Sequence, residues 1–417
     1  MSRLHVKHLL VGAGLASSAA AEAIRALDEA GSILMLGQEP VRPYHRPPLS
    51  KSFLRRERSR AELFARDADW FGANNVELRT GRRVAHLDVA RRTASVDDGD
   101  EITYDQLLLA TGAAAKHLSI PGAELQNVFY LRTLGDAEML QNAIAKAKNE
   151  GRGRATIVGG GLLGLELAST FTNAGLAVDL IVGDEHPWQA IVGETTGRFL
   201  SRHLHSKGVN VHLGQRPLRL EGDGRVQRVV LPEGDPIGCD FAVACIGSIV
   251  PRDLLRGTPI AAEKAILTDA RCRTNVDTVY AAGDCAAVFD PLFGKHRWID
   301  HRDNALVTGR IAGTNMAGGD ATYDVVNTFT SEIFDLRLTV WGSSRHIARR
   351  LLRGAATTET PEFAEIGIAA DGRVAQVVAI NGGKDFDGLR DLVRTRVNVD
   401  GREDALRDAS VAISPPS

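Results

Sequence analysis

The stretch Val11 to Ser17 reads VGAGLAS, and a second glycine-rich stretch, Val158 to Gly164, reads VGGGLLG. Each follows an apolar run and leads into an alanine- and leucine-rich segment with the composition of a helix. Glycines at these positions allow a tight turn that brings backbone N–H groups and a helix N-terminus to a pyrophosphate. One match is weak evidence, but two in the same strand, loop and helix context predict two bound dinucleotides.

Composition agrees with a multidomain enzyme. The 417 residues are 44% hydrophobic and 24% charged, enough for two to four domains with buried cores. The net charge of −2 lacks the bulk positive charge expected of a protein that binds nucleic acid or an anionic membrane. We therefore expect small molecules or one protein partner, no nucleic acid, no membrane, and a monomer or homodimer.

The four cysteines, Cys239, Cys245, Cys272 and Cys285, match neither zinc-ribbon nor iron–sulfur cluster spacing. We expect reduced core thiols and no metal site. Disulfide reductases carry a redox-active cysteine pair soon after the first nucleotide loop, and no cysteine precedes position 239. The segment from His8 to Ile24 superficially resembles a signal peptide, but it contains the glycine loop itself, so we expect a cytoplasmic protein.

Periodicity predicts a strand from Lys7 to Val11, a helix from Ala16 to Ala30 and a strand from Ser32 to Leu36, which together form a βαβ unit. The next fifteen residues, GQEPVRPYHRPPLSK, contain four prolines and are predicted to be an ordered, extended loop. Two further strands, in Thr103 to Gly112 and Thr278 to Cys285, are expected to end at the first nucleotide.

A weak internal repeat begins at Gly151 and, with segments 210–220 and 241–247, predicts a second nucleotide domain inserted into the first. Beyond Asp324, short apolar runs at 363–368 and 372–380 precede an expected helix from Asp385 to Val393, whereas 354–362 and the tail SPPS are expected to be loops. We predict an α/β protein with two Rossmann-like dinucleotide-binding domains and a C-terminal α+β domain. The expected boundaries are 1–115 with 246–323, then 116–245, then 324–417.

Seven stretches carry a family resemblance: VGAGLAS, PYHRPPLSK, YDQLLLATG, LRTLGDAEML, VGGGLLGLELA, VYAAGDCA and RVAQVVAINGGKDFDGLRDLV. They resemble the successive motifs of the FAD-dependent NAD(P)H:ferredoxin reductases of bacterial oxygenase systems. That family includes putidaredoxin reductase and biphenyl dioxygenase reductase, and apoptosis-inducing factor is related to it. The resemblance implies a glutathione-reductase-like flavoprotein fold, FAD on the first loop, NADH or NADPH on the second, and a [2Fe–2S] ferredoxin as partner.

The resemblance also implies site residues. Asp284, in the GD motif, is expected to contact the flavin side of FAD, although it could be a strand-end or capping residue. Gln38 and Glu39 compete for the adenosine ribose, and we choose Glu39 for its charge. The expected cofactor-binding residues are Gly12, Gly14, Ala16, Glu39, Arg46, Lys51, Thr111, Gly112, Arg132, Gly283, Asp284, Gly159, Gly161, Leu163, Gly164, Asp184 and Gly247.

Lys51 and Glu166 match a lysine and a glutamate that pair near the flavin in this family, and we assign them the catalytic role. A cation near flavin N5 would favour the reduced anionic ring. The alternative is an exposed lysine and a helix-surface glutamate.

The second nucleotide site departs from the family. At the end of the strand VDLIV the family usually has a ribose-binding glutamate, and this chain has Val182. Asp184 or Glu185 could replace the contact, and His186 could meet a phosphate. NADH is expected on family grounds alone, and NADPH stays open.

Two further departures concern the expected flavin edge. Thr328 and Thr330 replace aromatic residues of a PWFWS motif, and Arg302 stands where an aromatic residue is common. These changes leave open an NAD(P)H oxidase or quinone reductase without a ferredoxin, or a redox sensor like apoptosis-inducing factor. A basic docking face for an acidic ferredoxin could be Arg55, Arg56 and Arg58, or else Arg345, Arg349, Arg350 and Arg353, unless these are ordinary solvated arginines.

Overall fold

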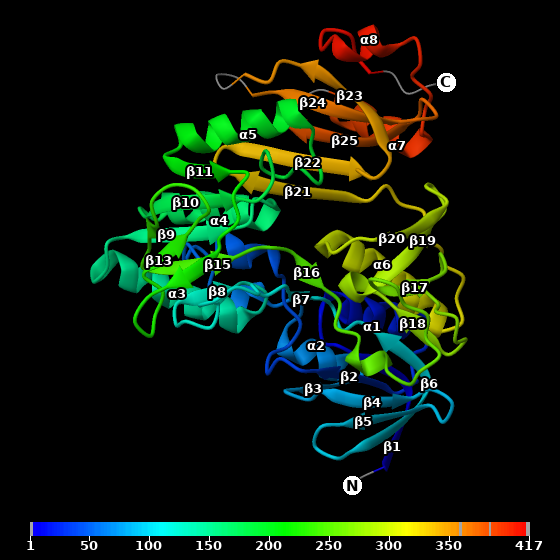
Figure 1. Ribbon diagram of the computed structural model, residues 1–417. Coiled ribbons are helices and arrows are strands. Elements are labelled where there is room, and N and C mark those ends of the chain that lie inside the picture. The colour runs from blue at the N-terminus through cyan, green and yellow to red at the C-terminus, as the bar shows by residue number, and fades with distance from the viewer. Residues whose placement is uncertain (1–2, 358–360, 383–384, 414–417) are drawn as a thin grey trace. The chain divides into compact units, whose positions relative to one another are not determined.

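The computed structural model describes residues 3–357, 361–382 and 385–413. Within them the chain forms two compact units (Figure 1). Unit 1 comprises residues 3–47, 59–114 and 248–325, and unit 2 comprises 48–58, 115–247 and 326–413. The two later domains expected from the sequence thus lie mostly in one unit, and the three-domain division stays a prediction.

Unit 1 is built on a seven-stranded sheet in the order β3-β2-β1-β6-β5-β4, with β18 also paired to β6. Its strands are β1 (Arg3–Val11), β2 (Ile33–Gly37), β3 (Val76–Thr80), β4 (Val84–Asp88), β5 (Thr93–Val96), β6 (Glu101–Leu109) and β18 (Val279–Ala281). The pairings of β1, β2, β3, β6 and β18 are parallel, as the βαβ prediction requires, and β4 and β5 are added antiparallel.

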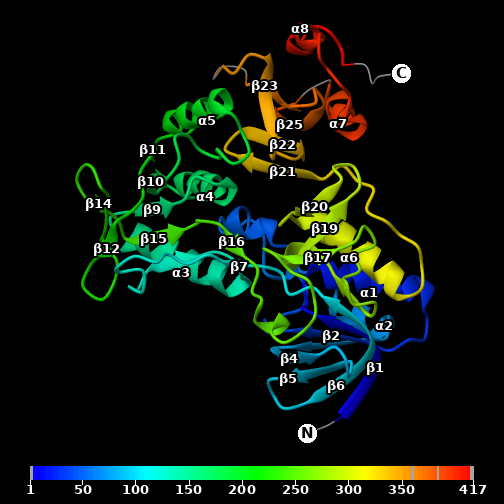
Figure 2. The same ribbon diagram turned by 45° about the vertical axis from the view of Figure 1, so that its right-hand side comes forward.

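Helices α1 (Leu15–Leu27) and α6 (Arg302–Met316) lie side by side in unit 1, as Figure 1 and Figure 2 both show. The remaining elements are α2 (Ala68–Ala73), β17 (Ile266–Thr268), β19 (Ala286–Asp290), β20 (Lys295–Trp298) and the 3-10 turns η2 (Ala61–Leu63), η3 (Asp253–Leu255) and η4 (Gly283–Cys285). The predicted helix end at Ala30 is wrong: α1 ends at Leu27 because the Asp28 carboxylate accepts from Gly31 N at 2.9 Å and turns the chain.

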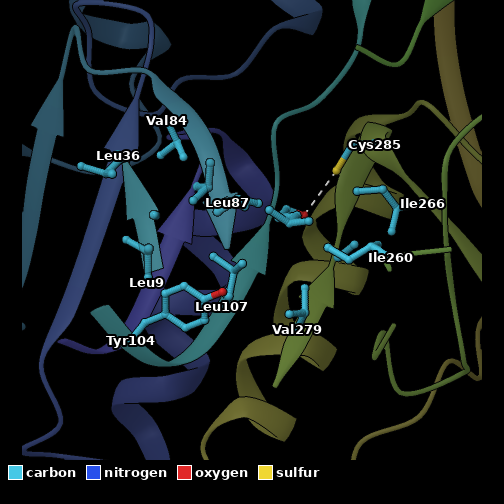
Figure 3. Packing of buried hydrophobic residues seen from close by; sticks show 14 of the residues in the cluster. Leu9, Leu36, Val84, Leu87, Tyr104, Leu107, Ile260, Ile266, Val279 and Cys285 are labelled. Atoms are coloured by element: carbon cyan, nitrogen blue, oxygen red, sulfur yellow. Dashed lines mark hydrogen bonds between the residues drawn. The ribbon is translucent and has the colours of Figure 1, made fainter. Parts of the chain in front are cut away.

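The parallel pairing of β18 with β6 confirms that the chain returns to the first sheet after the second glycine loop, with Val279 beside Leu107. Figure 3 shows the core around this junction, where Leu9, Leu107 and Val279 pack together. Cys285 Sγ donates to the carbonyl of Leu109 at 3.3 Å. A fully buried strand pair therefore holds the last segment of unit 1 in place.

Unit 2 contains a five-stranded parallel sheet in the order β11-β10-β9-β15-β8. Its strands are β8 (Val128–Tyr130), β9 (Arg154–Val158), β10 (Ala177–Val182), β11 (Val209–Leu213) and β15 (Phe241–Ala244), with helices α3 (Leu134–Asn149), α4 (Leu162–Asn173) and α5 (Glu194–Ser206). A small antiparallel sheet at the left of Figure 2 contains β12 (Arg219–Glu221), β13 (Arg228–Val230) and β14 (Ile237–Gly238).

The C-terminal part of unit 2 is an antiparallel sheet in the order β21-β22-β25-β24-β23, followed by two helices. The elements are β21 (Thr328–Ile333), β22 (Leu336–Gly342), β23 (Ile347–Gly354), β24 (Phe363–Ala369), β25 (Val374–Ile380), α7 (Phe386–Thr395) and α8 (Glu403–Arg407). The predicted α+β character is confirmed. The tail SPPS and residues 358–360 of the expected loop lie outside the described residues.

The chain crosses between the units in short segments. The proline-rich loop contains a 3-10 turn, η1 (Pro47–Ser50), at the first crossing, and β7 (Ala114–Ala115) and β16 (Ser248–Ile249) pair with each other where the chain leaves and returns. All four cysteines are free, and Cys239, Cys272 and Cys285 are buried as expected, whereas Cys245 is partly exposed. None of the helices in the described part of the chain is both long and apolar enough to span a bilayer.

Two candidate dinucleotide sites and a charged cluster

The first glycine loop, in unit 1, leaves no room for a side chain at Gly12 but is open at Gly14. Gly12 has φ +110°, and a Cβ there would lie 2.1 Å from the carbonyl oxygen of Ala110. Gly12 N donates to the carbonyl of Leu36 at 2.8 Å. Gly14 is the N-cap of α1, no side chain caps the helix, and no atom lies within 4 Å of the position of a Cβ on Gly14. The open helix N-terminus suits the pyrophosphate of FAD.

The GD turn lies beside the start of α1. Gly283 has φ +73°, and a Cβ on it would lie 3.1 Å from the Cβ of Ala16. Gly283 N donates to Thr308 Oγ1 at 2.9 Å, which ties the turn to α6. Of the other expected residues, Gly112 has φ +72° and Thr111 is exposed. Unit 1 therefore gathers the first loop, the GD turn and the end of β6 at one edge of its sheet.

The side chains of Glu39, Tyr44 and Arg46, which follow β2, each form a hydrogen bond with the other two. Glu39 Oε2 accepts from Tyr44 OH at 2.7 Å, and Oε1 accepts from Arg46 Nη2 at 2.7 Å. Burial opposes the charge of Arg46, but Tyr44, Glu39 and Asp284 outweigh burial and raise the pKa of the guanidinium. Glu39 therefore stands as a fixed carboxylate near the end of the second strand, where an adenosine ribose binds in this fold.

The second loop, in unit 2, repeats the geometry of the first. Gly159 has φ +122°, and a Cβ on it would lie 2.2 Å from the carbonyl oxygen of Cys245. Gly159 N donates to the carbonyl of Ile181 at 2.8 Å. Gly161 is the N-cap of α4, with no side chain capping the helix. The backbone of this loop therefore fits the pyrophosphate of a second dinucleotide.

The loops differ at their third small residue, and the structure explains the difference. A Cβ on Gly164 would lie 2.0 Å from the carbonyl oxygen of Gly159, so only glycine fits there. In the first loop the corresponding residue is Ser17, whose hydroxyl donates to the carbonyl oxygen of Gly12. A hydroxyl hydrogen bond thus replaces the close backbone approach of the second loop.

Other residues expected at the second site vary in placement. Leu163 is the second residue of α4, and Gly247 has φ +112° after β15. Arg132 N donates to Asp136 Oδ2 at 3.0 Å, before the capping box that begins α3. His186 is 5% exposed, and a Cβ on Gly197 of α5 would lie 1.9 Å from its Nδ1. The hypothesis that His186 meets a phosphate is wrong, because its ring is buried against α5.

Lys51 and Glu166 belong to a polar cluster that lies wholly in unit 2. Lys51 Nζ is 2.5 Å from Glu166 Oε1 and donates to Ser331 Oγ at 3.4 Å. The hydroxyl of Ser331 donates to Glu166 Oε1, and that of Ser50 donates to Glu166 Oε2. Thr170 Oγ1 donates to the carbonyl of Ser50 at 2.7 Å. Glu166 is therefore a buried carboxylate held on both oxygens, not a helix-surface residue.

Sequence reasoning missed the two serines of this cluster. Ser331 lies in the NTFTS segment, which differs from the family motif in the sequence by its missing aromatic residues. The cluster also influences a cysteine: burial, with a smaller contribution from Glu166, raises the pKa of Cys245 to about 12. A thiol with that pKa stays protonated at neutral pH and is a poor nucleophile.

The substituted aromatic positions take part in other contacts. Thr328 Oγ1 donates to the carbonyl of Val326 at 3.0 Å, and the hydroxyls of Thr330 and Thr339 lie 3.3 Å apart. Phe329, between the two threonines, meets Trp188 edge to face at 5.8 Å between ring centroids. Arg302, in unit 1, donates from Nε to Asp303 at 2.8 Å.

The second expected basic face is largely neutralised within unit 2. Arg353 is 3% exposed and pairs with Asp385, Arg350 pairs with Glu365, and Arg349 pairs with Asp400 and Glu403. Arg353 is therefore too buried to contribute to the expected docking face at Arg345, Arg349, Arg350 and Arg353, whereas Arg345 is exposed. The rest of that face stays a prediction. In the first cluster, Arg55 pairs with Glu57, while Arg56 and Arg58 are exposed.

Comparison with known proteins matches two family models. Residues 6–309 match the pyridine nucleotide-disulphide oxidoreductase family, and residues 329–415 match a reductase C-terminal family. The chain is 32% identical to the biphenyl dioxygenase system ferredoxin–NAD(+) reductase component of Paraburkholderia xenovorans, covering 94% of each chain. It is 31% identical to a ferredoxin–NAD(P)(+) reductase of Sphingomonas, covering 96% of this chain and 95% of that one.

Among solved structures, the chain is similar to the reductase in the covalent putidaredoxin reductase–putidaredoxin complex. The TM-score is 0.91 at 27% identity, covering 98% of this chain and 97% of the other. The similarity spans both glycine loops and the C-terminal sheet.

Proposed function

The chain belongs to the pyridine nucleotide-disulphide oxidoreductase family, and from that membership we propose that it is an FAD-dependent NAD(P)H:ferredoxin oxidoreductase. When bound, FAD supplies the redox chemistry: it takes a hydride from NAD(P)H and passes single electrons to a [2Fe–2S] ferredoxin that serves an oxygenase. The observation that carries the proposal is the repeated loop geometry. At Gly12 and at Gly159 the backbone passes so close to a strand-end carbonyl that a Cβ would clash with it.

The protein's own contribution is binding and electrostatics. Gly12, Gly14 and Gly283 keep the FAD site of unit 1 free of side chains, and Arg46 with Glu39 closes its ribose end. Gly159, Gly161 and Gly164 do the same for NAD(P)H in unit 2. Hydride transfer between two bound cofactors requires positioning rather than an acid or base, so no catalytic triad is needed.

Lys51 supplies a held positive charge in this proposal. Its ammonium group is fixed by Glu166 and Ser331, and its side chain is 20% exposed. A preorganised charge in a site with little water stabilises developing negative charge better than a mobile lysine would. We assign Lys51 and Glu166 to the flavin edge on the family resemblance.

The acceptor is proposed to be a ferredoxin rather than a disulfide. The chain has no cysteine before Cys239, and all four of its cysteines are free. The free thiols also suit a reducing compartment, and we place the reaction in the cytoplasm. Arg56 and Arg58 are the exposed arginines of the first basic cluster, which we propose steers an acidic ferredoxin.

A second candidate is an NAD(P)H oxidase or quinone reductase, because Thr328 and Thr330 stand where the family has aromatic residues. One anaerobic titration with NADH and with NADPH, followed by an acceptor panel, separates the candidates. Fast cytochrome c reduction only when a [2Fe–2S] ferredoxin is added supports the leading proposal. Fast reduction of oxygen or quinone alone supports the second, and slow turnover with a persistent long-wavelength band would instead indicate a redox sensor.

A further inference from the structure

The end of β10 presents no negative charge to a ribose. In this type of fold, an acid at that position binds the 2′-OH of NADH and repels a 2′-phosphate. Here the position is Val182, which is 1% exposed. Its side chain packs on the second glycine loop, because a Cβ on Gly160 would lie 2.6 Å from Val182 Cγ1. The second glycine loop thus contacts an apolar residue, Val182, at the position where a carboxylate would favour NADH over NADPH.

An arginine occupies the space beside the next residue. A Cβ on Gly183 would lie 2.9 Å from Arg216 Nε and 3.1 Å from Cζ, so the guanidinium lies over the Gly183 backbone. Any other residue at 183 would displace it. Arg216 Nη2 also lies 3.4 Å from Asp184 Oδ1, a long contact between side chains that are 77% and 54% exposed.

The backbone fixes the segment that carries Arg216. Gly214 N donates to the carbonyl of Asp184 at 2.9 Å, and Gln215 N donates to the carbonyl of Val182 at 3.1 Å. These bonds lie immediately after β11, the strand paired with β10. Arg216 is therefore placed by paired backbone rather than by a free loop, at the carboxyl ends of two parallel strands, where nucleotides bind in α/β folds.

We propose that Arg216 binds the 2′-phosphate of the adenosine ribose, so that the second loop takes NADPH in preference to NADH. A guanidinium presents a planar fork of donors that matches a phosphate, and its exposed pairing with Asp184 is weak enough to yield to a dianion. The inference rests on the proposed function only in requiring that the second loop bind a pyridine nucleotide. It differs from the expectation of NADH, which rests on the family resemblance and on relatives named ferredoxin–NAD(+) reductases.

Isothermal titration of the FAD-loaded full chain with NADP⁺ and NAD⁺, and with 2′,5′-ADP and 5′-AMP, tests the proposal. We expect NADP⁺ to bind about tenfold more tightly than NAD⁺, and Arg216→Met to weaken NADP⁺ binding by about tenfold while NAD⁺ stays within about twofold. Asp184→Asn removes the competing carboxylate and should tighten NADP⁺ binding. Arg219→Met, at an exposed arginine paired with Glu221, is the matched control and should change neither affinity.

The proposal is overturned if 2′,5′-ADP binds no better than 5′-AMP, or if Arg216→Met weakens NAD⁺ and NADP⁺ binding equally. Ferredoxin reduction is measured separately with whichever nucleotide binds. Selective NADP⁺ binding without ferredoxin reduction contradicts the proposed acceptor and leaves the role of Arg216 supported. Ferredoxin reduction by NADH with unselective binding contradicts the role of Arg216 alone.

Discussion

At the scale of the residue, the charge of Lys51 is the feature most directly open to test. Replacing Lys51 with methionine keeps most of the side-chain volume and leaves the buried Glu166 carboxylate without its cation. We expect flavin reduction by NAD(P)H to slow by about tenfold or more, the scale of one lost preorganised charge. Stopped-flow absorbance measures the rate, and Lys207→Met, at a half-exposed lysine of unit 2 paired with Asp335, is the control. An unchanged rate in Lys51→Met would end the assignment.

Ser331 is expected to act as a positioning residue for the same pair. Ser331→Ala removes the hydroxyl that donates to Glu166 Oε1 and lies 3.4 Å from Lys51 Nζ. The loss should cost about 1–2 kcal/mol of stability and alter the pH profile of flavin reduction. Ser331→Thr keeps the hydroxyl and should restore the profile. A profile identical in wild type and Ser331→Ala would mean that the serine has only a packing role.

Single residues also mark how far the sequence could predict the site. The loop glycines were predictable because a tight turn requires glycine at fixed spacings within a few residues of sequence. They are Gly12, Gly14, Gly159, Gly161 and Gly164. Ser331 was not, because it meets Glu166 across 165 residues and no local pattern reports such a contact. Arg216 was missed for the same reason, since only the pairing of β10 with β11 places it beside Gly183.

At the scale of the element, the contact between α1 and α6 depends on glycine. A Cβ on Gly309 would lie 2.2 Å from the carbonyl oxygen of Ala16, and one on Gly313 would lie 2.3 Å from that of Ala20. We expect Gly309→Ala to cost about 3 kcal/mol or more through overpacking. Because Ala16 is in the first turn of α1, FAD retention should fall as well.

Thermal unfolding and the flavin content after gel filtration measure both effects of Gly309→Ala. Arg310→Ala changes the next residue of α6, which is exposed, and serves as the control. If Gly309→Ala unfolds at the wild-type temperature, the helices have more room to separate than the close approach implies.

The N-terminus of α5 depends on a residue from the C-terminal sheet. Glu365, on β24 and 3% exposed, accepts from Gly193 N at 2.8 Å and from Thr196 Oγ1 at 2.5 Å, and it pairs with Arg350. Glu365→Gln should cost about 2–4 kcal/mol, because a buried pair loses its anion and the helix loses a charged cap. Glu194→Gln, at an exposed glutamate on the same helix, should cost under about 0.5 kcal/mol. An equal decrease in melting temperature, relative to wild type, in the two variants would contradict this prediction.

The strands themselves were more predictable from the sequence than the strands and side chains with which elements pair. Strands β1, β2, β6 and β18 were expected from apolar runs, and the antiparallel addition of β4 and β5 was not. In VAHLD at Val84–Asp88 only Val84 and Leu87 are buried, and such a mixed pattern gives a weaker signal than a buried parallel strand. The Glu365 cap could not be predicted, because the carboxylate and the helix that it caps are 172 residues apart.

At the scale of the whole molecule, stability should depend on two buried histidines, one in each unit. Burial lowers the pKa of His8 and of His203 below the ordinary value of 6.5. The unfolded chain therefore binds more protons than the folded chain just below pH 6.5, so stability falls as the pH drops through that range. We expect a lower melting temperature at pH 5.5 than at pH 7.5.

The variant that tests this pH dependence is His8→Asn combined with His203→Gln. It removes both titrating rings, and the change in melting temperature between pH 7.5 and pH 5.5 should shrink. Changing the exposed His86 to asparagine should leave the pH dependence as it is in the wild type. A double variant with the full wild-type pH dependence would place its origin in other groups.

The interleaved course of the chain has a practical consequence for engineering. Residues 48–58 belong to unit 2 although they follow directly on residues 3–47 of unit 1. A chimera that exchanged only residues 115–247 and 326–413 with a relative would keep Ser50 and Lys51 from one parent and take Glu166 and Ser331 from the other. Residues 48–58 must therefore be exchanged together with the other two segments of unit 2. Otherwise the chimera will combine a lysine from one parent with a glutamate from the other.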